Sequence, residues 1–364
     1  MSLILTFLGK GGVGRTTVAI AAAKRLANSK RVLLAFGDTG PVPLSLVGAN
    51  LSADPQQLAP NLDAVQFQST VLLERSWEEV KKLEAQYLRT PIIKEVYGQE
   101  LGVLPGMDSA LALNALREYD AAGKYDVLVY DGTGDKALLR MLGTPEIASW
   151  YIRRFRDLFI NSDLGKTLSP FIQPVTAAIL NVNIGDNNFA QPTNQVNNLL
   201  DQGKAAMSDP KRVVAYLVTG ADNGAQAQAK YLWGSAQQVG LTVAGVIFNS
   251  ASVGNTSAPE EFAPLPVSTL PVRIGDDWQP LIDALPDFLT SSAAPKPIEI
   301  DIAARQVRLF LPGFDKKQVK LTQSGPEVTI DAGDQRRNIY LPPQLSGQSV
   351  KGAKFQNNYL TISF

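Results

Sequence analysis

A glycine-rich segment near the start of the chain has residue types and spacing suited to holding phosphate. The segment GKGGVGRTT spans residues 9–17. In such turns, backbone N–H groups converge on an anion, and a following helix adds the positive end of its dipole. Against the P-loop pattern G-x-x-x-x-G-K-[ST], Gly9, Gly14 and Thr16 match, and Arg15 replaces the lysine. The segment therefore predicts a phosphate-binding loop with an altered cation.

Arg15 is the departure that bears most on chemistry. It keeps the positive charge but presents a wide planar guanidinium, which is not interchangeable with a compact ammonium at a tight phosphate site. Misplacing one preorganised donor costs on the order of 10²–10³ in rate. We therefore expect hydrolysis to suffer more than binding. Lys10, inside the loop, offers a second cation.

Three polar residues follow apolar runs that read as buried strands. They are Asp38, Asp131 and Asn249, and ligands of open parallel sheets bind beyond the carboxyl ends of the strands. The Thr16 hydroxyl is placed to ligate Mg²⁺, Asp131 to act on the metal or its water, and Asp38 to orient a water. Taken singly, each Asp also fits a turn or a helix cap. Their joint placement at strand ends favours a nucleotide site.

The elements that must position these residues follow from apolar periodicity. Short apolar runs with helical patterns between them predict an α/β domain over residues 1–290, with a mostly parallel sheet and a helical insertion. A linker rich in small residues and Pro follows at 291–296, and residues 297–364 alternate with period two, which predicts an all-β sandwich. The five runs are 3–8, 32–36, 127–130, 213–218 and 243–248.

Long helices are expected at 71–88 and 145–160. The second carries Ile147, Tyr151, Phe155 and Leu158 at helical spacing. Ordinary core packing is one interpretation, and an apolar groove built from residues 145–206 is the other.

Composition excludes several classes of chemistry. The 364-residue chain contains no Cys and no His, so a disulfide, a thiol nucleophile, an imidazole base and the usual zinc sites are excluded. Any metal must bind oxygen. The 34 basic and 34 acidic residues balance, which gives no support for nucleic acid as a partner. The start of the chain reads as a strand and no stretch is long enough to span a membrane, so we expect a cytoplasmic protein.

The motifs of residues 1–290 resemble the arsenite-pump and tail-anchored-protein targeting ATPases, the ArsA/Get family. KGGVGRTT resembles that family's deviant P-loop, which also has a lysine in second place. The segments at 104–119 and 125–146 look like its proline-glycine helix start and its switch II region. VAGVIFNS, at 243–250, looks like its adenine-binding strand, and LPVR, at 270–273, like its adenine-side loop.

The resemblance implies a homodimer that binds ATP and Mg²⁺. Lys10 would reach the phosphates bound by the partner subunit, and Asp38 would take the water-activating switch I position. These two are the candidate catalytic residues, and Thr16 is the candidate Mg²⁺ ligand. The other candidate nucleotide contacts are Gly9, Gly11, Gly12, Val13, Gly14, Arg15, Thr17, Asp131, Asn249 and Pro271.

The chain also departs from the family's pattern. Switch I usually reads Asp-Pro-Ala-His, where this chain has DTGP at 38–41, and the usual Asp-Thr-Ala-Pro-Thr-Gly-His of switch II is DGTGDKA at 131–137. The cysteines that hold the targeting factor's dimer zinc and those that bind arsenite are absent. Switch motion can therefore differ, and zinc and thiol-bound arsenite are not expected.

Residues 297–364 resemble the α-crystallin domain of small heat-shock proteins. RLFLPGFDKKQVKL, at 308–321, matches its strand, Pro-Gly turn and strand, and 336–345 and 353–364 match its late strands. The chain stops at Phe364, without the Ile-x-Ile extension that many such chaperones use to assemble. The resemblance implies a module for packing or client contact.

Three functions remain open. The first is an ATP-regulated dimer that shields hydrophobic segments of client proteins along the groove at 145–206, with the sandwich assisting. The second is a pump-driving or regulatory ATPase that acts with a membrane partner. The third is a scaffold that binds nucleotide without hydrolysing it, for which Arg15 is the main argument.

Overall fold

The computed structural model describes residues 1–87, 106–161, 190–249, 260–290 and 294–364. Several predicted features fall partly outside these ranges. They are the central part of the candidate groove at 162–189, linker residues 291–293, Ser250 of the adenine-binding strand and the first two residues of the segment at 104–119.

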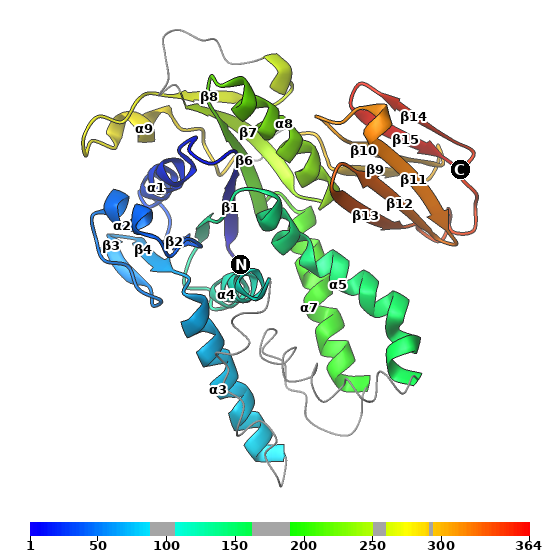
Figure 1. Cartoon of the computed structure of the whole chain (residues 1–364), viewed down its shortest axis with the longest axis horizontal. Coiled ribbons are helices and arrows are strands. Elements are labelled where there is room, and N and C mark those ends of the chain that lie inside the picture. The colour runs from blue at the N-terminus through cyan, green and yellow to red at the C-terminus, as the bar shows by residue number, and fades with distance from the viewer. Residues whose placement is uncertain (88–105, 162–189, 250–259, 291–293) are drawn as a thin grey trace.

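The first domain is built on one eight-stranded sheet with the order β3-β4-β2-β5-β1-β6-β7-β8 (Figure 1). All neighbouring strands are parallel except β3 and β4, which are antiparallel. The strands are β1 (Leu3–Leu8), β2 (Val32–Phe36), β3 (Gln56–Ala59), β4 (Leu62–Gln66), β5 (Val127–Asp131), β6 (Val213–Thr219), β7 (Thr242–Asn249) and β8 (Val267–Leu270). The predicted parallel sheet is confirmed, and all five predicted runs are strands in it.

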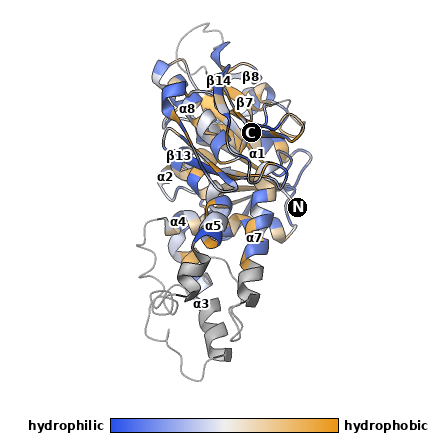
Figure 2. Cartoon of the chain, turned by 90° about the vertical axis from the view of Figure 1, so that its right-hand side faces the viewer, coloured by the Kyte–Doolittle hydropathy of each residue, from blue (hydrophilic) through white to orange (hydrophobic). Residues whose placement is uncertain are grey.

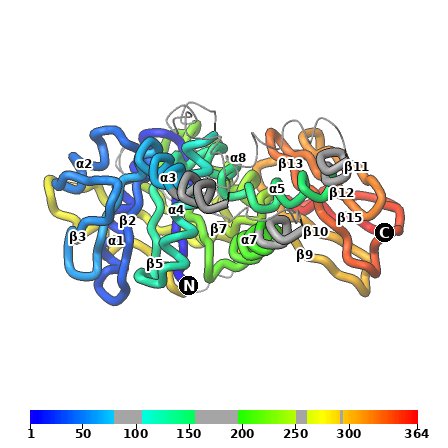
Figure 3. The backbone as a smooth tube through the Cα atoms, turned by 90° about the horizontal axis from the view of Figure 1, so that it is seen from below, coloured from blue at the N-terminus to red at the C-terminus, as the bar shows by residue number. Residues whose placement is uncertain are grey.

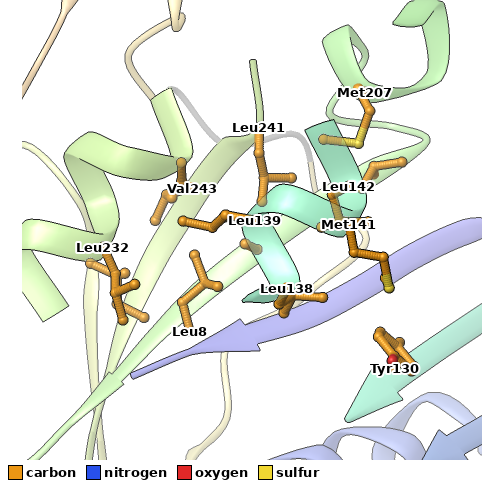
Figure 4. Close-up of a cluster of buried hydrophobic side chains, with 14 of the residues drawn as sticks. Leu8, Tyr130, Leu138, Leu139, Met141, Leu142, Met207, Leu232, Leu241 and Val243 are labelled. Atoms are coloured by element: carbon orange, nitrogen blue, oxygen red, sulfur yellow. The ribbon is translucent and has the colours of Figure 1, made fainter. Parts of the chain in front are cut away.

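Helices cover both faces of this sheet because its strands alternate apolar side chains toward each face. The helices are α1 (Arg15–Leu26), α2 (Pro41–Val47), α3 (Ser69–Tyr87), α4 (Met107–Ala121), α5 (Lys136–Asn161), α7 (Ala190–Ser208), α8 (Asn223–Gln238) and α9 (Gln279–Ala284), with a 3₁₀ turn at Glu260–Phe262. One core layer joins α1, α2 and α9 to the sheet. The opposite layer joins α4, α5, α7 and α8 to it. Figure 4 shows Leu139 of α5 near Leu8 and Val243, and Met141 of the same helix on the side of Tyr130.

The C-terminal domain is a sandwich of a four-stranded sheet, β14-β15-β10-β9, and a three-stranded sheet, β11-β12-β13. Its elements are β9 (Ile298–Asp301), β10 (Gln306–Phe310), a 3₁₀ turn (Lys316–Gln318), β11 (Val319–Ser324), β12 (Glu327–Ala332), β13 (Gln335–Tyr340), β14 (Gly352–Gln356) and β15 (Tyr359–Ser363). Inward residues such as Val307, Leu309, Ile330 and Ile362 form one buried cluster, as the period-two pattern predicts. Figure 2 shows hydrophilic residues over β13.

The sandwich packs tightly against α8, through a contact that we call the interdomain joint. It consists of Lys230, Tyr231, Trp233 and Gly234 of α8 and Phe310, Pro312, Gly313 and Phe314 of the sandwich. The ring centroids lie 5.3 Å apart for Trp233 and Phe310, and 5.5 Å apart for Tyr231 and Phe314. A Cβ at Gly313 would lie 2.5 Å from the Lys230 carbonyl oxygen, and one at Gly234 would lie 2.1 Å from that of Pro312. Glycine at both positions therefore lets the two backbones touch.

The helix predicted at 145–160 is the second half of α5, which begins nine residues earlier, at Lys136, and contains Pro145. Ile147 and Tyr151 are 40% and 54% exposed, so the core interpretation is wrong for these two side chains. Side chains from residue 155 to the end of α5 lie outside the described set. The antiparallel pair α5 and α7 lies between the sheet and the sandwich when seen from below (Figure 3).

Candidate nucleotide site

The glycine-rich loop lies between β1 and α1, at the carboxyl edge of the sheet. Gly12 and Gly14 have φ of +83° and +90°, which residues with a Cβ rarely adopt. No atom lies within 4 Å of a Cβ placed at Gly11 or Gly12, so this side of the loop is open. Helix α1 starts with no side-chain cap and no acidic residue in its first turn. Its first N–H groups are thus available to an anion.

Asn249, at the end of β7, reaches this loop. Its Nδ2 donates to the Val13 carbonyl at 3.0 Å, and a Cβ at Gly14 would lie 2.5 Å from that nitrogen. Leu270 pairs with Asn249 across β7 and β8, so Pro271 follows beside it on the surface. The structure thus brings both predicted adenine-side residues to the edge that carries the loop.

Arg15 is turned toward the loop at 131–135. Its Nη1 donates to the Gly132 carbonyl at 3.3 Å and also to that of Thr133. A Cβ at Gly134, whose φ is +64°, would collide with the guanidinium. Partial burial lowers the pKa of Arg15, and the charges of Asp131 and Asp135 oppose that shift. The residue that replaces the P-loop lysine thus ties the two loops together.

Asp131 ends β5 and is 5% exposed. Burial raises the pKa of its carboxyl to about 6; a hydrogen bond from the Thr16 hydroxyl and the charge of Arg15 oppose the shift, and the charge of Asp38 adds to it. The predicted metal ligand and the predicted switch II acid are therefore neighbours. Oxygen donors of this kind suit Mg²⁺.

Asp38 is exposed beyond the end of β2. Its Oδ1 accepts from the Gly40 N–H at 2.7 Å, and its carbonyl accepts from Gln66 Nε2 at 2.9 Å. The turn interpretation of this aspartate is therefore correct, and its Oδ2 accepts no hydrogen bond from any residue in the described part of the chain. Asp38 lies on the same edge as Asp131 because β2 and β5 are neighbours.

Lys10 projects from the loop and forms an ion pair with Asp222. Its Nζ lies 3.0 Å from Asp222 Oδ2, with the two side chains 51% and 62% exposed. Asp222 also caps α8 by accepting from the Ala225 N–H at 2.8 Å, and Lys10 lowers the pKa of its carboxyl. Exposed pairs of this kind are weak, so Lys10 is held in place by little energy.

Sequence reasoning missed two kinds of residue at this site. Gly134 was not singled out, although its carbonyl accepts from the Gly9 N–H at 2.9 Å and its own φ is positive. Asp222 was also missed, although Asp followed by a helical run is an N-cap signal. The cap could have been read from the sequence, but its contact with Lys10 joins residues 212 positions apart.

ATP and Mg²⁺ fit the residues that are present. The open face at Gly11 and Gly12 and the uncapped start of α1 suit phosphate. Thr16 and Asp131 would supply the metal with protein oxygens. Among the described residues, no group of three or more acidic side chains is placed to hold a metal ion. None of the described helices has both the length and the apolarity needed to cross a bilayer.

The chain matches known protein families over most of its length. Residues 2–262 match the model of the anion-transporting ATPase family, ArsA, and residues 303–364 match an HSP20-like domain found in ArsA. A putative arsenical pump-driving ATPase of Chlorobaculum tepidum is 25% identical, over 99% of this chain and 95% of its own length. A putative arsenical pump-driving ATPase 1 of Aquifex aeolicus is 22% identical over 99% of both chains.

A second group of relatives shares only part of the chain. An ATPase ASNA1 homolog of Paramecium tetraurelia is 26% identical over 42% of this chain and 46% of its own length. The family match, in contrast, spans most of the first domain, including the loop at 9–17, Asp38, Asp131 and Asn249. The protein is therefore a member of the anion-transporting ATPase family that also carries the HSP20-like domain found in ArsA.

Proposed function

We propose that this protein binds and hydrolyses ATP with Mg²⁺ as a homodimer, and that its nucleotide state governs the shielding of hydrophobic segments of client proteins. The observation that carries the nucleotide part is the convergence of an open anion-binding loop, Thr16 and the buried Asp131 at one sheet edge. The family membership supports the same activity.

Each residue has a defined task in this proposal. The N–H groups of residues 11–17 receive the phosphates, and Thr16 and Asp131 hold the metal or its water. Asp38 positions the attacking water, and Lys10 leaves Asp222 to reach the phosphates bound by the partner subunit. Bound Mg²⁺ supplies charge neutralisation on the phosphate oxygens. Asn249 and Pro271 border the adenine.

The client part rests on the exposed apolar residues of α5. Ile147 and Tyr151 are four positions apart in α5 and therefore lie on one helix face, and both are open to solvent. Burying such a stripe against an apolar segment is favourable in proportion to the area removed from water. This face would be the described end of the groove predicted at 145–206.

The first test is ATP binding and single-turnover hydrolysis by the full chain with Mg²⁺. We expect Lys10→Ala and Asp38→Asn each to lower the rate by about 100-fold, the scale of removing one preorganised group. Lys211→Ala, at an exposed lysine away from the loop, serves as the control. Binding without hydrolysis in the wild type would favour the scaffold, and Arg15→Lys would then show whether this side chain limits the rate.

The client test uses a fluorescent apolar peptide with ATP, with ADP and without nucleotide. Replacing Ile147 and Tyr151 by Ser should weaken peptide binding and remove its dependence on nucleotide. The matched variant replaces Ile300 and Ile302, which are 42% and 46% exposed on the sandwich. Loss of peptide binding only in this second variant would place the client site on the sandwich. Peptide binding of equal strength with ATP, with ADP and without nucleotide would contradict the proposal.

The names of the relatives point to the second candidate, an ATPase that drives an arsenical pump. This chain contains no Cys, so arsenite could not stimulate it through thiol ligands. Turnover that rises only when a membrane partner is added, with no peptide binding, would favour this candidate over client shielding.

A further inference from the structure

Helix α5 connects the nucleotide site directly to the C-terminal sandwich. Its first residue, Lys136, comes one position after the loop at 131–135. That loop contacts the glycine-rich loop through the bond from the Gly9 N–H to the Gly134 carbonyl and through the bonds from Arg15. Any shift of the loop must therefore move, or be resisted by, the first turn of α5.

The sandwich holds this first turn with one carboxylate. Asp334, in the turn between β12 and β13, lies 2.7 Å from Lys136 Nζ and 3.1 Å from Arg140 Nη2. The two cations are four residues apart and so lie on the same helix face. Lys136, through its hydrogen bond and its charge, lowers the pKa of the Asp334 carboxyl.

A second anchor holds the same hairpin farther along α5. Glu327, at the start of β12, accepts from Trp150 Nε1 at 3.2 Å and from Arg153 Nη2 at 2.9 Å. The strand steps from Glu327 to Ala332 cover about 17 Å, and the turn that carries Asp334 follows directly. The 13 to 14 helical residues between the two pairs of partners cover about 20 Å. The hairpin of β12 and β13 is therefore attached to α5 at two points, one in the first turns of the helix and one near Trp150.

We propose that Asp334 is a positioning residue for the nucleotide site. It fixes the first two turns of α5 and, through them, the loop that carries Asp131 and the carbonyl groups that receive Arg15. The effect on catalysis rests on the proposed function, whereas the effect on the loop does not. Because coupling is reciprocal, a ligand that shifts the loop also shifts the hairpin of β12 and β13.

The first arm measures amide hydrogen exchange at residues 131–140 without nucleotide. The variant is Asp334→Asn, and the matched control is Asp331→Asn, since Asp331 is an ion-paired aspartate of the same hairpin whose partner, Arg336, lies within the sandwich. We expect faster exchange in Asp334→Asn alone. Equal exchange in the two variants would overturn the proposal, whether or not the protein binds ATP.

The second arm measures kcat and KM for ATP in the same proteins. Exposed ion pairs are weak, so we expect Asp334→Asn to change kcat by about two- to fivefold, with little change in the thermal unfolding midpoint. Asp334→Glu, which retains the charge, should restore most of the rate. A wild type that does not hydrolyse ATP would refute the proposed function only. If the wild type hydrolyses ATP and the kcat of Asp334→Asn equals that of Asp331→Asn, the positioning role is refuted.

Discussion

Glycine does opposite work in the glycine-rich loop and in the interdomain joint. At Gly11 and Gly12 a side chain would meet nothing within 4 Å, so the missing side chains leave room for a ligand. At Gly234 and Gly313 a side chain would meet backbone of the other domain, so their absence lets two parts of the chain touch. The loop glycines leave polar backbone groups exposed and open to a ligand, and the joint glycines bury polar backbone groups between the two domains. We therefore expect substitutions in the joint to cost stability and those in the loop to cost binding.

The largest expected loss of stability is at Gly313. Gly313→Ala places a methyl group against the Lys230 backbone at a φ of +78°, and overpacking plus the left-handed conformation should cost about 2 to 5 kcal/mol. Gly347→Ala is the control, since Gly347 has a φ of +85° in the same domain with nothing within 4 Å. It should cost only about 1 to 2 kcal/mol. Equal losses in urea unfolding would mean that the joint contributes little.

A gain of stability is expected at Asp131, within the site. Its pKa is about 6 in the folded protein against a reference value of 3.8, so the folded state binds the proton more tightly. Its contribution to the free energy of unfolding therefore decreases as pH rises from about 4 through about 6. Asp131→Asn should raise that free energy by about 2 to 3 kcal/mol at pH 8 and by little at pH 4, while hydrolysis is lost.

Thermal unfolding at several pH values, with a chemical-denaturation check at pH 4 and pH 8, would measure this difference. Curves for Asp131→Asn and the wild type that stay parallel over the whole range would contradict it. Such a result would mean that the buried carboxylate of Asp131 does not lower the stability of the folded protein. The contrast between the nucleotide site and the interdomain joint would then weaken.

The smallest effect on stability is expected at Gly11. Gly11→Ala should change the free energy of unfolding by no more than about 0.5 kcal/mol, because the added methyl group meets no protein atom. It should weaken ATP binding by about tenfold or more, the equivalent of losing one hydrogen bond to a charged group. Fluorescent-nucleotide titration and urea unfolding on one preparation give both quantities. A variant that loses stability but keeps its affinity would reverse the comparison.

Local patterns predicted the frame of this molecule well. The five apolar runs are all strands of the main sheet, and the alternation after residue 297 gives the sandwich with its inward residues buried. Strands β3, β4 and β8 were missed because polar residues interrupt them: they read QQLA, LDAVQ and VSTL, whereas the five predicted runs are almost wholly apolar. Helix α5 was cut short because Pro145 was read as a helix start, although the chain continues through it.

Partners distant in the sequence could not be predicted. Arg15 was singled out as a departure, but its contacts with residues 132 and 133 lie 117 and 118 positions away. The same holds for Lys10 with Asp222 and for Lys136 with Asp334. Such pairs are set by how the strands order themselves in the sheet and by how the domains dock. Side-chain spacing along the chain carries no record of either.

Helix α8 has a consequence for how this protein can change over evolutionary time. One side of the helix packs on the main sheet and the other on the sandwich, so Leu232, Trp233 and Ala236 are all buried. A descendant that lost residues 297–364 would expose Tyr231 and Trp233 to water. These side chains could then contact the same residues of other molecules, and such an apolar surface favours aggregation. The sandwich is therefore hard to discard: deletion would first require new polar residues along α8.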